Sequence, residues 1–281
     1  MPPVTVREHA LRPRSIPGCL ALFLVAIGWL ARAASAAEVD YLAVRGSAFH
    51  LAVDDLEGDG ADELIYATYD GWVRCADAAT ARTEHWAYRI DHFPTALLVR
   101  AERRGAAPCI FVADVDGRLT ALAADGRERW RWEAGLALHG VAWVRLGGGR
   151  AALAVGGLGK PLVLLDPDSG RELARLPMQA FVQRLAAGDL DGDGTDEIAV
   201  ADHRENLALC RWREGRLELI SRAPLFLGEE FKNWESPGGT FKVFSLALGD
   251  LDGDGRAEIV AGDSYFNPQA DRKSTRLNSS H

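Results

Sequence analysis

The amino-acid sequence predicts an all-β protein, a β-propeller built from four-stranded blades. Three observations lead to this prediction. Sequence markers recur at a spacing of about 45 residues, short stretches alternate polar and apolar residues with a period of two, and residues 37–270 lack a sustained helical period of 3.6. A repeat of four short strands cannot bury both faces alone, so neighbouring repeats are expected to stack as blades.

The repeat is visible in residues that return along the chain. Trp86 returns 44 residues later as Trp130, and the acidic segment that begins at Asp55 reappears at Asp189, three periods further on. Helical hairpin repeats can have a similar period, so the local pattern has to decide between the two folds. Blades are therefore predicted at about residues 46–92, 93–138, 139–180 and 181–240, with a partial fifth blade at about 241–270.

The local pattern is that of strands. Phe49, Leu51 and Val53 alternate with other residues ahead of the first acidic segment, which predicts a half-buried strand with these side chains on one face. Continuous apolar runs, which suit strands buried on both faces, follow the three acidic segments at residues 64–66, 198–200 and 259–261.

Both ends of the chain carry segments that we separate from the fold. Residues 1–36 place basic residues, an apolar run and small residues in the order of a secretory signal peptide. The apolar run at residues 19–30 is shorter than the roughly 20 residues of a membrane-spanning helix, which is the alternative. We expect export to the periplasm, the cell surface or the medium, without membrane insertion after cleavage. Residues 271–281 read as a translated sequencing adapter, so the propeller is expected to be C-terminally truncated.

The charge of the segment between these ends excludes some partners. Residues 37–270 contain 25 Lys and Arg against 38 Asp and Glu, a net charge of −13. This balance excludes nucleic acid and anionic membrane surfaces as expected partners and suits cation binding. Cys75, Cys109 and Cys210 are widely spaced and odd in number, so they show no disulfide framework, although one bridge among them stays open.

Three acidic segments share one sequence pattern and are the predicted metal-binding sites. Each begins at an aspartate, Asp55, Asp189 or Asp250, and places carboxylates at positions 1, 3, 5 and 9 with glycine at position 6. Ca²⁺ takes six to eight oxygen ligands, and a tight loop can turn alternate carboxylates inward. The glycine permits the positive φ that such a loop needs. The predicted Ca²⁺ ligands, including the backbone carbonyl of position 7, are Asp55, Glu57, Asp59, Ala61 and Glu63; Asp189, Asp191, Asp193, Thr195 and Glu197; and Asp250, Asp252, Asp254, Arg256 and Glu258.

Two other interpretations of these segments compete with this one. An EF-hand or dockerin loop needs a carboxylate at position 12, where this chain has Tyr66, Val200 and Ala261. The segments also lead into predicted strands rather than helices. The remaining alternative is an acidic turn that binds no metal.

The repeated string Asp-Leu-Asp-Gly-Asp-Gly ahead of a strand, at residues 189–194 and 250–255, resembles the FG-GAP/VCBS repeats of secreted bacterial proteins and integrin α-subunits. The resemblance implies a calcium-binding propeller over most of residues 46–266. The second and third blades depart from it. The aligned positions, Ala101, Arg103 and Gly105 in one and roughly Val144, Leu146 and Gly148 in the other, cannot hold calcium. Residues 116–130 instead resemble a quinoprotein-type (PQQ-like) propeller repeat, in which tryptophans dock neighbouring blades.

Two further features bear on function. Trp86, Trp130, Trp132 and Trp212 recur near blade ends and are expected to pack between blades, with a sugar-stacking platform as the alternative. The spacing from the second to the third acidic segment exceeds the period by about 16 residues, which fall near residues 221–240. This insertion is either a binding loop or an ordinary connection.

No catalytic residues are predicted, because the histidines form no zinc-binding pattern and no nucleophile motif is present. The sequence therefore predicts an exported, calcium-binding module for adhesion, binding or scaffolding, with an unidentified protein or carbohydrate ligand. The alternative is the propeller domain of a secreted enzyme, a polysaccharide lyase or a quinoprotein dehydrogenase.

Overall fold

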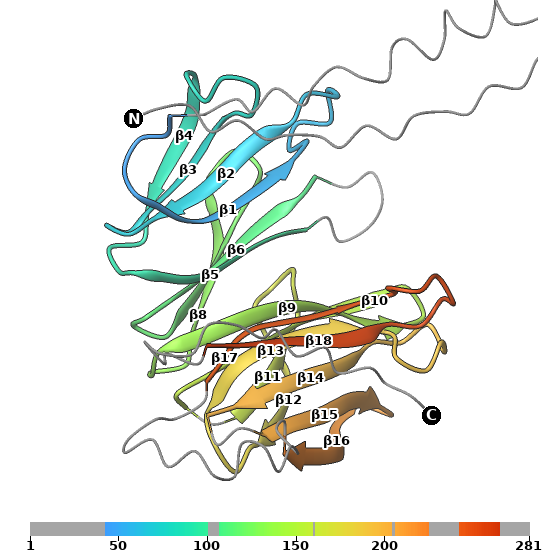
Figure 1. Cartoon of the computed structure of the whole chain (residues 1–281). Coiled ribbons are helices and arrows are strands. Elements are labelled where there is room, and N and C mark those ends of the chain that lie inside the picture. The colour runs from blue at the N-terminus through green and yellow to red at the C-terminus, as the bar shows by residue number, and fades with distance from the viewer. Residues whose placement is uncertain (1–42, 101–106, 160, 204–205, 225–241, 265–281) are drawn as a thin grey trace, which may run out of the picture. The chain divides into compact units, whose positions relative to one another are not determined.

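The protein is described from a computed structural model, which covers residues 43–100, 107–159, 161–203, 206–224 and 242–264 (Figure 1). These residues form eighteen strands joined by turns and short connections. The strands make four four-stranded sheets and one two-stranded sheet, all antiparallel. Within these ranges no helix has the length and apolar character needed to cross a membrane.

Each sheet is built from consecutive strands, so each is one blade of the predicted kind. The first sheet contains β1 (Ala48–Asp54), β2 (Glu63–Thr68), β3 (Trp72–Asp77) and β4 (Glu84–Arg89). The second contains β5 (Pro94–Arg100), β6 (Cys109–Asp114), β7 (Arg118–Leu122) and β8 (Glu128–Glu133). The third contains β9 (Leu138–Gly147), β10 (Arg150–Gly157), β11 (Pro161–Leu165) and β12 (Glu172–Pro177). The fourth contains β13 (Val182–Gly188), β14 (Glu197–Asp202), β15 (Asn206–Arg213) and β16 (Arg216–Pro224), and the fifth contains β17 (Lys242–Gly249) and β18 (Glu258–Ser264).

The structure locates two of the approximate boundaries. The second blade was predicted to end near residue 138, and Leu138 is the first residue of β9. The start of the predicted insertion, at residues 221–224, belongs to β16, and its remainder at 225–241 lies outside the described residues.

The first strands of successive sheets lie next to one another. β1 contacts β5, β5 contacts β9, β9 contacts β13, and β13 contacts β17. Each of these strands also carries a β-bulge at the same register against its second strand. The bulged residues are Phe49, Thr95, His139, Gln183 and Phe244, and they fix the alignment of the five repeats independently of sequence similarity.

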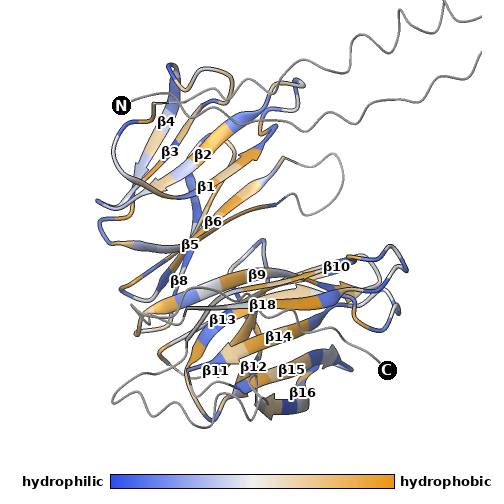
Figure 2. Cartoon of the chain, viewed as in Figure 1, coloured by the Kyte–Doolittle hydropathy of each residue, from blue (hydrophilic) through white to orange (hydrophobic). Residues whose placement is uncertain are grey.

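The core lies between the sheets. One apolar cluster joins the first sheet to the second, with Ile65 and Val73 against Ile110 and Val112. Equivalent clusters join the second sheet to the third and the third to the fourth. The second strands β2, β6 and β14 are buried along their whole length, and β6 and β14 are largely apolar in Figure 2. Stacking therefore buries both faces of these strands, as the continuous apolar runs predicted.

Two tryptophans form hydrogen bonds between successive sheets. The indole Nε1 of Trp86 in β4 donates to the carbonyl of Ala124 in the next sheet at 2.8 Å, and that of Trp130 in β8 donates to Pro167 at 2.9 Å. Each ring also lies against a turn glycine, at which an added Cβ would come within 2.6 Å of the ring. Trp86 and Trp130 thus pack between blades. Trp132 and Trp212 contribute to apolar clusters as half-buried side chains.

Two burial predictions were wrong. Phe49, Leu51 and Val53 are 57%, 70% and 53% exposed, because it is the other face of β1 that packs on the core, through Ala52. The run in β18 is also not fully buried, since Val260 is 39% exposed. Within the described residues, no further sheet covers the apolar face of β1 that carries Phe49, Leu51 and Val53, or the face of β18 that carries Val260.

Candidate metal-binding loops

The three acidic loops occupy one structural position in their blades. Each connects the first strand to the second, so the residue before the loop pairs with the glutamate at position 9: Asp54 with Glu63, Gly188 with Glu197, and Gly249 with Glu258. The antiparallel pairing therefore brings both ends of each loop together. The glycines at positions 4 and 6 all have positive φ, between 75° and 89°, which lets the chain turn sharply twice.

The carboxylate at position 1 organises each loop. In the second loop, Asp189 Oδ1 accepts from the N–H groups of Gly192 at 2.7 Å and Asp193 at 3.1 Å, and Oδ2 accepts from Gly194 at 2.8 Å. The equivalent aspartates of the other two loops accept from the same glycine positions. In so tight a loop these backbone N–H groups have no backbone carbonyl to bond to, and the carboxylate serves as their acceptor instead.

The glutamate at position 9 closes the loop from the other end. Glu197 Oε2 accepts the N–H of Leu190 at 3.0 Å, and Glu63 and Glu258 accept from Leu56 and Leu251 at 2.8 Å and 2.7 Å. Glu63 and Glu197 are both 5% exposed. Each glutamate uses one oxygen for this bond, so its second oxygen remains available to a cation.

The predicted ligands come together in two of the three loops. One carboxylate oxygen each from Asp189, Asp191 and Glu197 lies within 4.8 Å of the others, and the same holds for Asp250, Asp252 and Asp254. The structure groups neither Asp193 nor Glu258 with them. Ligation by the carbonyls of Ala61, Thr195 and Arg256 stays a prediction.

The first loop has the same backbone but a different arrangement of side chains. Its predicted ligands Asp55, Glu57, Asp59 and Glu63 do not form a group of this kind in the described residues. Glu57 is exposed, and its Oε1 lies 3.9 Å from Nδ1 of His85 in β4. Binding in this loop would require Glu57 to turn inward.

The electrostatics of the second loop suit a divalent cation. Burial raises the pKa of Glu197, and the charges of Asp191, Asp193 and Asp189 raise it further, while the N–H of Leu190 lowers it. The negative charges around Glu197 disfavour its charged form, and a bound cation would reverse that effect. The donors are carboxylate oxygens, the ligands that Ca²⁺ prefers, so the second and third loops fit this ion.

An arginine that the sequence did not single out ties the second loop to the preceding blade. Arg145 in β9 donates from its backbone N–H to Asp196 Oδ2 at 2.7 Å, and its guanidinium Nη2 lies 2.6 Å from Asp196 Oδ1. Asp196 in turn donates its N–H to the carbonyl of Arg145 at 2.9 Å. Nη2 also lies 4.0 Å from Oδ2 of Asp189. A fixed positive charge from the third blade therefore stands beside the acidic loop of the fourth.

The hydrogen bond of Arg145 with Asp196 also shows that the predicted alignment of the third blade was wrong. Asp196 and Ala257 both stand at position 8 of their loops, and each donates its N–H to a carbonyl of the preceding blade. Ala257 donates to Asp189, which is at loop position 1. Asp196 donates to Arg145, so Arg145 also stands at loop position 1. The predicted position was Val144, one residue too early. Counting 44 residues back from Asp189, the period shared by the tryptophans, would have found it.

The second blade replaces the loop glutamate with a thiol. Arg100 pairs with Cys109 across β5 and β6 as Gly188 pairs with Glu197, so Cys109 stands at position 9. The aligned residues Ala101, Arg103 and Gly105 lie outside the described residues. Cys75, Cys109 and Cys210 are all free and buried, so none of the bridges left open by the sequence is formed among them.

Comparisons with known proteins agree with this architecture. A model of the FG-GAP-like repeat family matches residues 189–261, which contain the second and third acidic loops. No curated protein matches the chain.

Among solved structures, the chain is similar to BBS1N in a crystal of its complex with ARL6DN soaked with lead. The TM-score is 0.57 at 15% identity, over 79% of this chain and 64% of that one. It is similar to a chain of the mitotic checkpoint complex, with a TM-score of 0.55 at 14% identity over 72% and 55%. For Sqt1 of Saccharomyces cerevisiae the values are 0.56 and 11%, over 75% and 55%. This chain spans less than two thirds of each of these chains, and at such identities the likeness shows the fold alone. The protein is a repeat β-propeller, and its residues 189–261 match the model of the FG-GAP-like repeat family.

Proposed function

We propose that this chain is an exported binding or scaffolding module whose acidic loops bind Ca²⁺ to stabilise the blades. The observation that carries the proposal is the gathering of three carboxylate oxygens within 4.8 Å in each of two loops of the same backbone design. When bound, the ion would neutralise side chains that otherwise repel one another. Asp189, Asp191 and Glu197 would hold it in one loop, and Asp250, Asp252 and Asp254 in the other.

The expected contribution to stability is modest at each site. Calcium loops of extracellular modules bind with dissociation constants of about 10⁻⁴–10⁻³ M. At about 1 mM Ca²⁺, a site of 10⁻⁴ M adds about 1.4 kcal/mol to the free energy of unfolding. Two such sites would raise the melting temperature by about 5–10 °C in a domain of this size.

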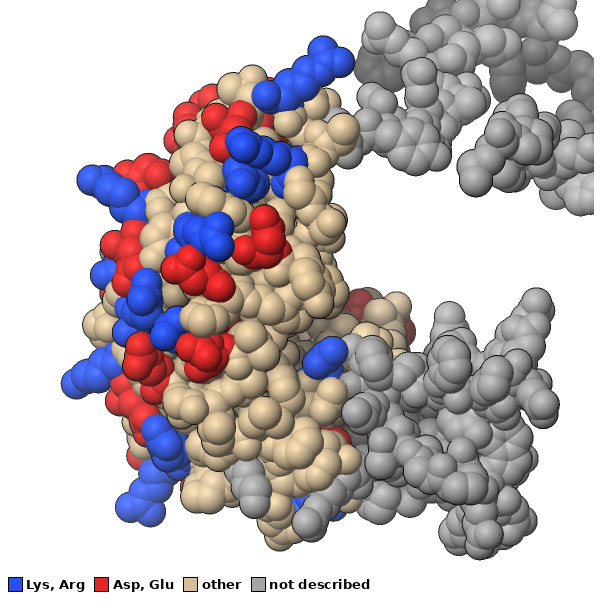
Figure 3. Space-filling view, turned by 90° about the vertical axis from the view of Figure 1, so that its left-hand side faces the viewer, with Lys and Arg blue, Asp and Glu red and all other residues tan. Residues whose placement is uncertain are grey.

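The proposal that the chain binds a macromolecule has separate support. The propeller fold offers a rigid scaffold, and the similar structures include BBS1N in complex with ARL6DN. In Figure 3, acidic and basic side chains are interspersed along the left side of the face, and uncharged side chains cover much of the rest. Such a face suits a protein or carbohydrate partner better than a polyanion such as nucleic acid. We propose no catalytic role for the described blades.

The calcium proposal is tested by thermal unfolding of the wild type with 1 mM CaCl₂ or with EGTA. We expect the stated increase with calcium and none with MgCl₂ at the same concentration. The double variant Asp250→Asn with Asp252→Asn should lose about half of the increase. Asp125→Asn, in an exposed turn away from the loops, is the matched control and should keep it. Equal melting temperatures with calcium and EGTA would contradict the proposal.

Export is tested separately by N-terminal sequencing of the protein recovered from outside the cytoplasm. A mature N-terminus near Ala37 would support export, and an intact Met1 in the cytoplasmic fraction would contradict it.

A further inference from the structure

The end of the sheets opposite the acidic loops exposes apolar side chains. The acidic loops join first strands to second strands, so the turns between second and third strands lie at the other end of each antiparallel sheet. In the first three blades these turns present Tyr69, Val115 and Leu158, which are 67%, 47% and 40% exposed. Figure 3 views the molecule toward this end, where β1 begins in Figure 1, and uncharged side chains cover much of the face beside its charged left side.

The three turn residues stand at one position of the repeat. The backbone N–H of each donates, at 2.9–3.0 Å, to a carbonyl just ahead of the first strand of its own blade. The acceptors are Ser47, Phe93 and Ala137. The repeat therefore places an apolar side chain at the same corner of three successive blades, instead of scattering single ones over the surface.

Two more exposed side chains lie between these corners. Phe49 is 57% exposed, and its ring centre lies 4.7 Å from that of Phe93. The Phe93 ring centre in turn lies 4.9 Å from that of Tyr69. Leu136 is 53% exposed and lies against the turn of the second blade, where a Cβ added at Gly117 would come within 2.4 Å of the Leu136 carbonyl oxygen. We define the apolar strip as Phe49, Tyr69, Val115, Leu136 and Leu158.

Stacking of further sheets does not account for the apolar strip. The sheets pack face to face, so the apolar clusters lie between them. Leu51 and Val53 lie on an uncovered sheet face, so a neighbouring sheet would bury them. Tyr69, Val115 and Leu158 lie in turns beyond the ends of the strands, which a face-to-face neighbour leaves open. A contiguous apolar surface of this kind is typical of a binding site for another molecule.

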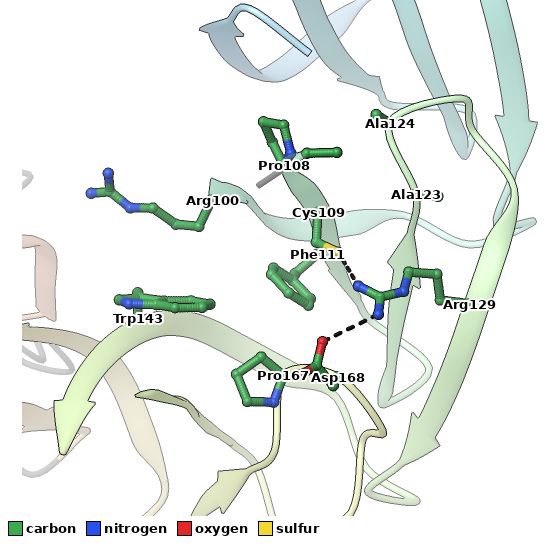
Figure 4. Close-up of a pocket in the computed structure, with 11 residues that line it drawn as sticks. Arg100, Pro108, Cys109, Phe111, Ala123, Ala124, Arg129, Trp143, Pro167 and Asp168 are labelled. Atoms are coloured by element: carbon green, nitrogen blue, oxygen red, sulfur yellow. Dashed lines mark hydrogen bonds and ion pairs between the residues drawn. The ribbon is translucent and has the colours of Figure 1, made fainter. Parts of the chain in front are cut away.

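A hollow beside Leu136 gives the apolar strip a place for an anchoring side chain. It lies between the second and third blades, has a volume of about 170 Å³, and its apolar lining includes Trp132, Leu136, Leu138, Val155, Pro161 and Val163. Protein interfaces obtain much of their affinity from a few side chains buried in such pockets. The pocket in Figure 4 lies between the same blades at the opposite end, and there Arg129 is already paired with Cys109 and Asp168. The hollow at the strip is therefore the better candidate for an apolar anchor.

Acidic side chains flank the apolar strip in the first two blades. Asp70 and Asp116 directly follow the strip residues of the first two turns, and both are exposed. Asp116 lies 3.1 Å from Nη2 of Arg118, whereas Asp70 forms no ion pair with another described residue. The hydroxyl of Thr68 donates to Asp70 at 2.6 Å, and this bond holds the pKa of the Asp70 carboxyl below its usual range. Asp70 is therefore charged at neutral pH and available to a basic side chain.

We propose that the apolar strip binds an extended segment of a partner protein that carries apolar side chains and at least one basic residue. One apolar side chain of the segment would fill the hollow, others would lie on Tyr69 and Val115, and the basic residue would pair with Asp70. Three of the five strip residues are aliphatic, which favours a protein over a carbohydrate, since sugars stack on aromatic rings. This inference rests on the proposed role as a binding module and does not depend on calcium.

The test selects peptides from a library of random dodecapeptides displayed on phage, with the full chain in about 1 mM CaCl₂ as the target. We expect the enriched peptides to share apolar residues and at least one lysine or arginine. The enriched peptide that binds best is then synthesised, and its affinity is measured by fluorescence polarisation. A selection that enriches no peptide overturns the inference.

Substitutions locate the bound peptide. Tyr69→Ser, Val115→Ser and Leu136→Ser should each weaken its binding by about tenfold or more, because each removes apolar surface at the contact. Asp70→Asn should weaken binding by about threefold and reduce its dependence on salt, because one ion pair is lost. Leu219→Ser is the matched control, since Leu219 is 48% exposed in β16 and lies outside the strip. It should leave the affinity unchanged.

The outcomes separate this inference from the proposed function. The variants are expected to fold because their side chains are exposed, and thermal unfolding checks this. Equal binding of the selected peptide to wild type and to the three serine variants of the strip would overturn the inference, while the chain would remain a binding module with its site elsewhere. Binding to a glycan array that Tyr69→Ser abolishes, and that Val115→Ser and Leu136→Ser retain, would assign the strip to a sugar and also overturn it.

Discussion

At the scale of single residues, one carboxylate determines whether an acidic loop forms. Asp189 accepts three backbone N–H groups of its own loop and supplies one of the three gathered oxygens. Asp189→Ala removes these acceptors and one ligand together. We expect a loss of about 2–3 kcal/mol in the free energy of unfolding in urea, with a smaller stabilisation by calcium.

The matched control is Asp125→Ala, since Asp125 also accepts a backbone N–H in a turn but lies outside the loops. It should cost less than about 1 kcal/mol and leave the calcium response unchanged. Equal losses in the two variants would show that Asp189 is no more than an ordinary turn residue.

The pair of Arg145 and Asp196 joins two blades through one buried carboxylate. The Asp196 side chain is 6% exposed, so Arg145→Met leaves a buried charge without its guanidinium partner. We expect a loss of about 2 kcal/mol, less than for a fully buried pair, because Arg145 is itself half exposed. The double variant Arg145→Met with Asp196→Asn should recover part of the loss. Simple additivity in this double-mutant cycle would contradict a direct interaction.

At the scale of structural elements, the turn glycines that receive the docking tryptophans cannot carry a side chain. At Gly170, φ is +68° and an added Cβ would lie 2.6 Å from the Trp130 ring. Gly170→Ala should therefore separate the second and third blades locally and cost more than about 2 kcal/mol, read from urea unfolding. Gly135→Ala is the control, because Gly135 has a similar φ of +76° but open space around it. Its cost should be only the backbone strain of about 1 kcal/mol.

The elements also show how far the sequence could predict the fold. The period, the continuous apolar runs and the three acidic segments predicted an all-β propeller, because each of these signals is local to one repeat. The exposure of Phe49, Leu51 and Val53 could not be predicted in this way. Alternation shows that a strand has two different faces, but which face is covered depends on the neighbouring sheet.

The candidate sites were predictable to different degrees. Spacing found the acidic loops, because their ligands are neighbours in the chain. Arg145 was missed for two reasons. Its partner Asp196 lies 51 residues away in the sequence. The predicted alignment of the third blade was also wrong by one residue, so it placed Val144 at loop position 1.

At the scale of the whole molecule, we expect histidines in the first strands to make the free energy of unfolding depend on pH. Burial lowers the pKa of His50 in β1 and of His139 in β9, and in both cases the charge of Arg184 in β13 lowers it further. The His139 ring donates to the carbonyl of Val182 at 2.9 Å, and backbone hydrogen bonds of His50 with Pro94 and Thr95 likewise oppose the lowering of the pKa. Of these strands, β13 lies beside β9, where His139 contacts the carbonyl of Val182, two residues before Arg184.

The sign of the effect follows from proton binding. The unfolded chain has histidines with the ordinary pKa of 6.5, while the folded chain keeps His50 and His139 neutral to lower pH. Below about pH 6.5 the unfolded state therefore binds more protons, and the free energy of unfolding should fall as the pH falls from 7.5 to 5. Urea unfolding of wild type and His139→Gln over this range checks the prediction. An identical pH dependence in the two proteins would show that His139 does not contribute.

The most direct measurement of the central claim is the number of calcium ions that the folded chain binds. Equilibrium dialysis against radioactive Ca²⁺ at about 1 mM, within the range of extracellular modules, gives that number. The two gathered loops predict at least two ions per chain, with one lost in Asp189→Asn and a different one lost in Asp250→Asn. A chain that binds no calcium, or that binds the same number after both substitutions, would contradict the claim that these loops are metal sites.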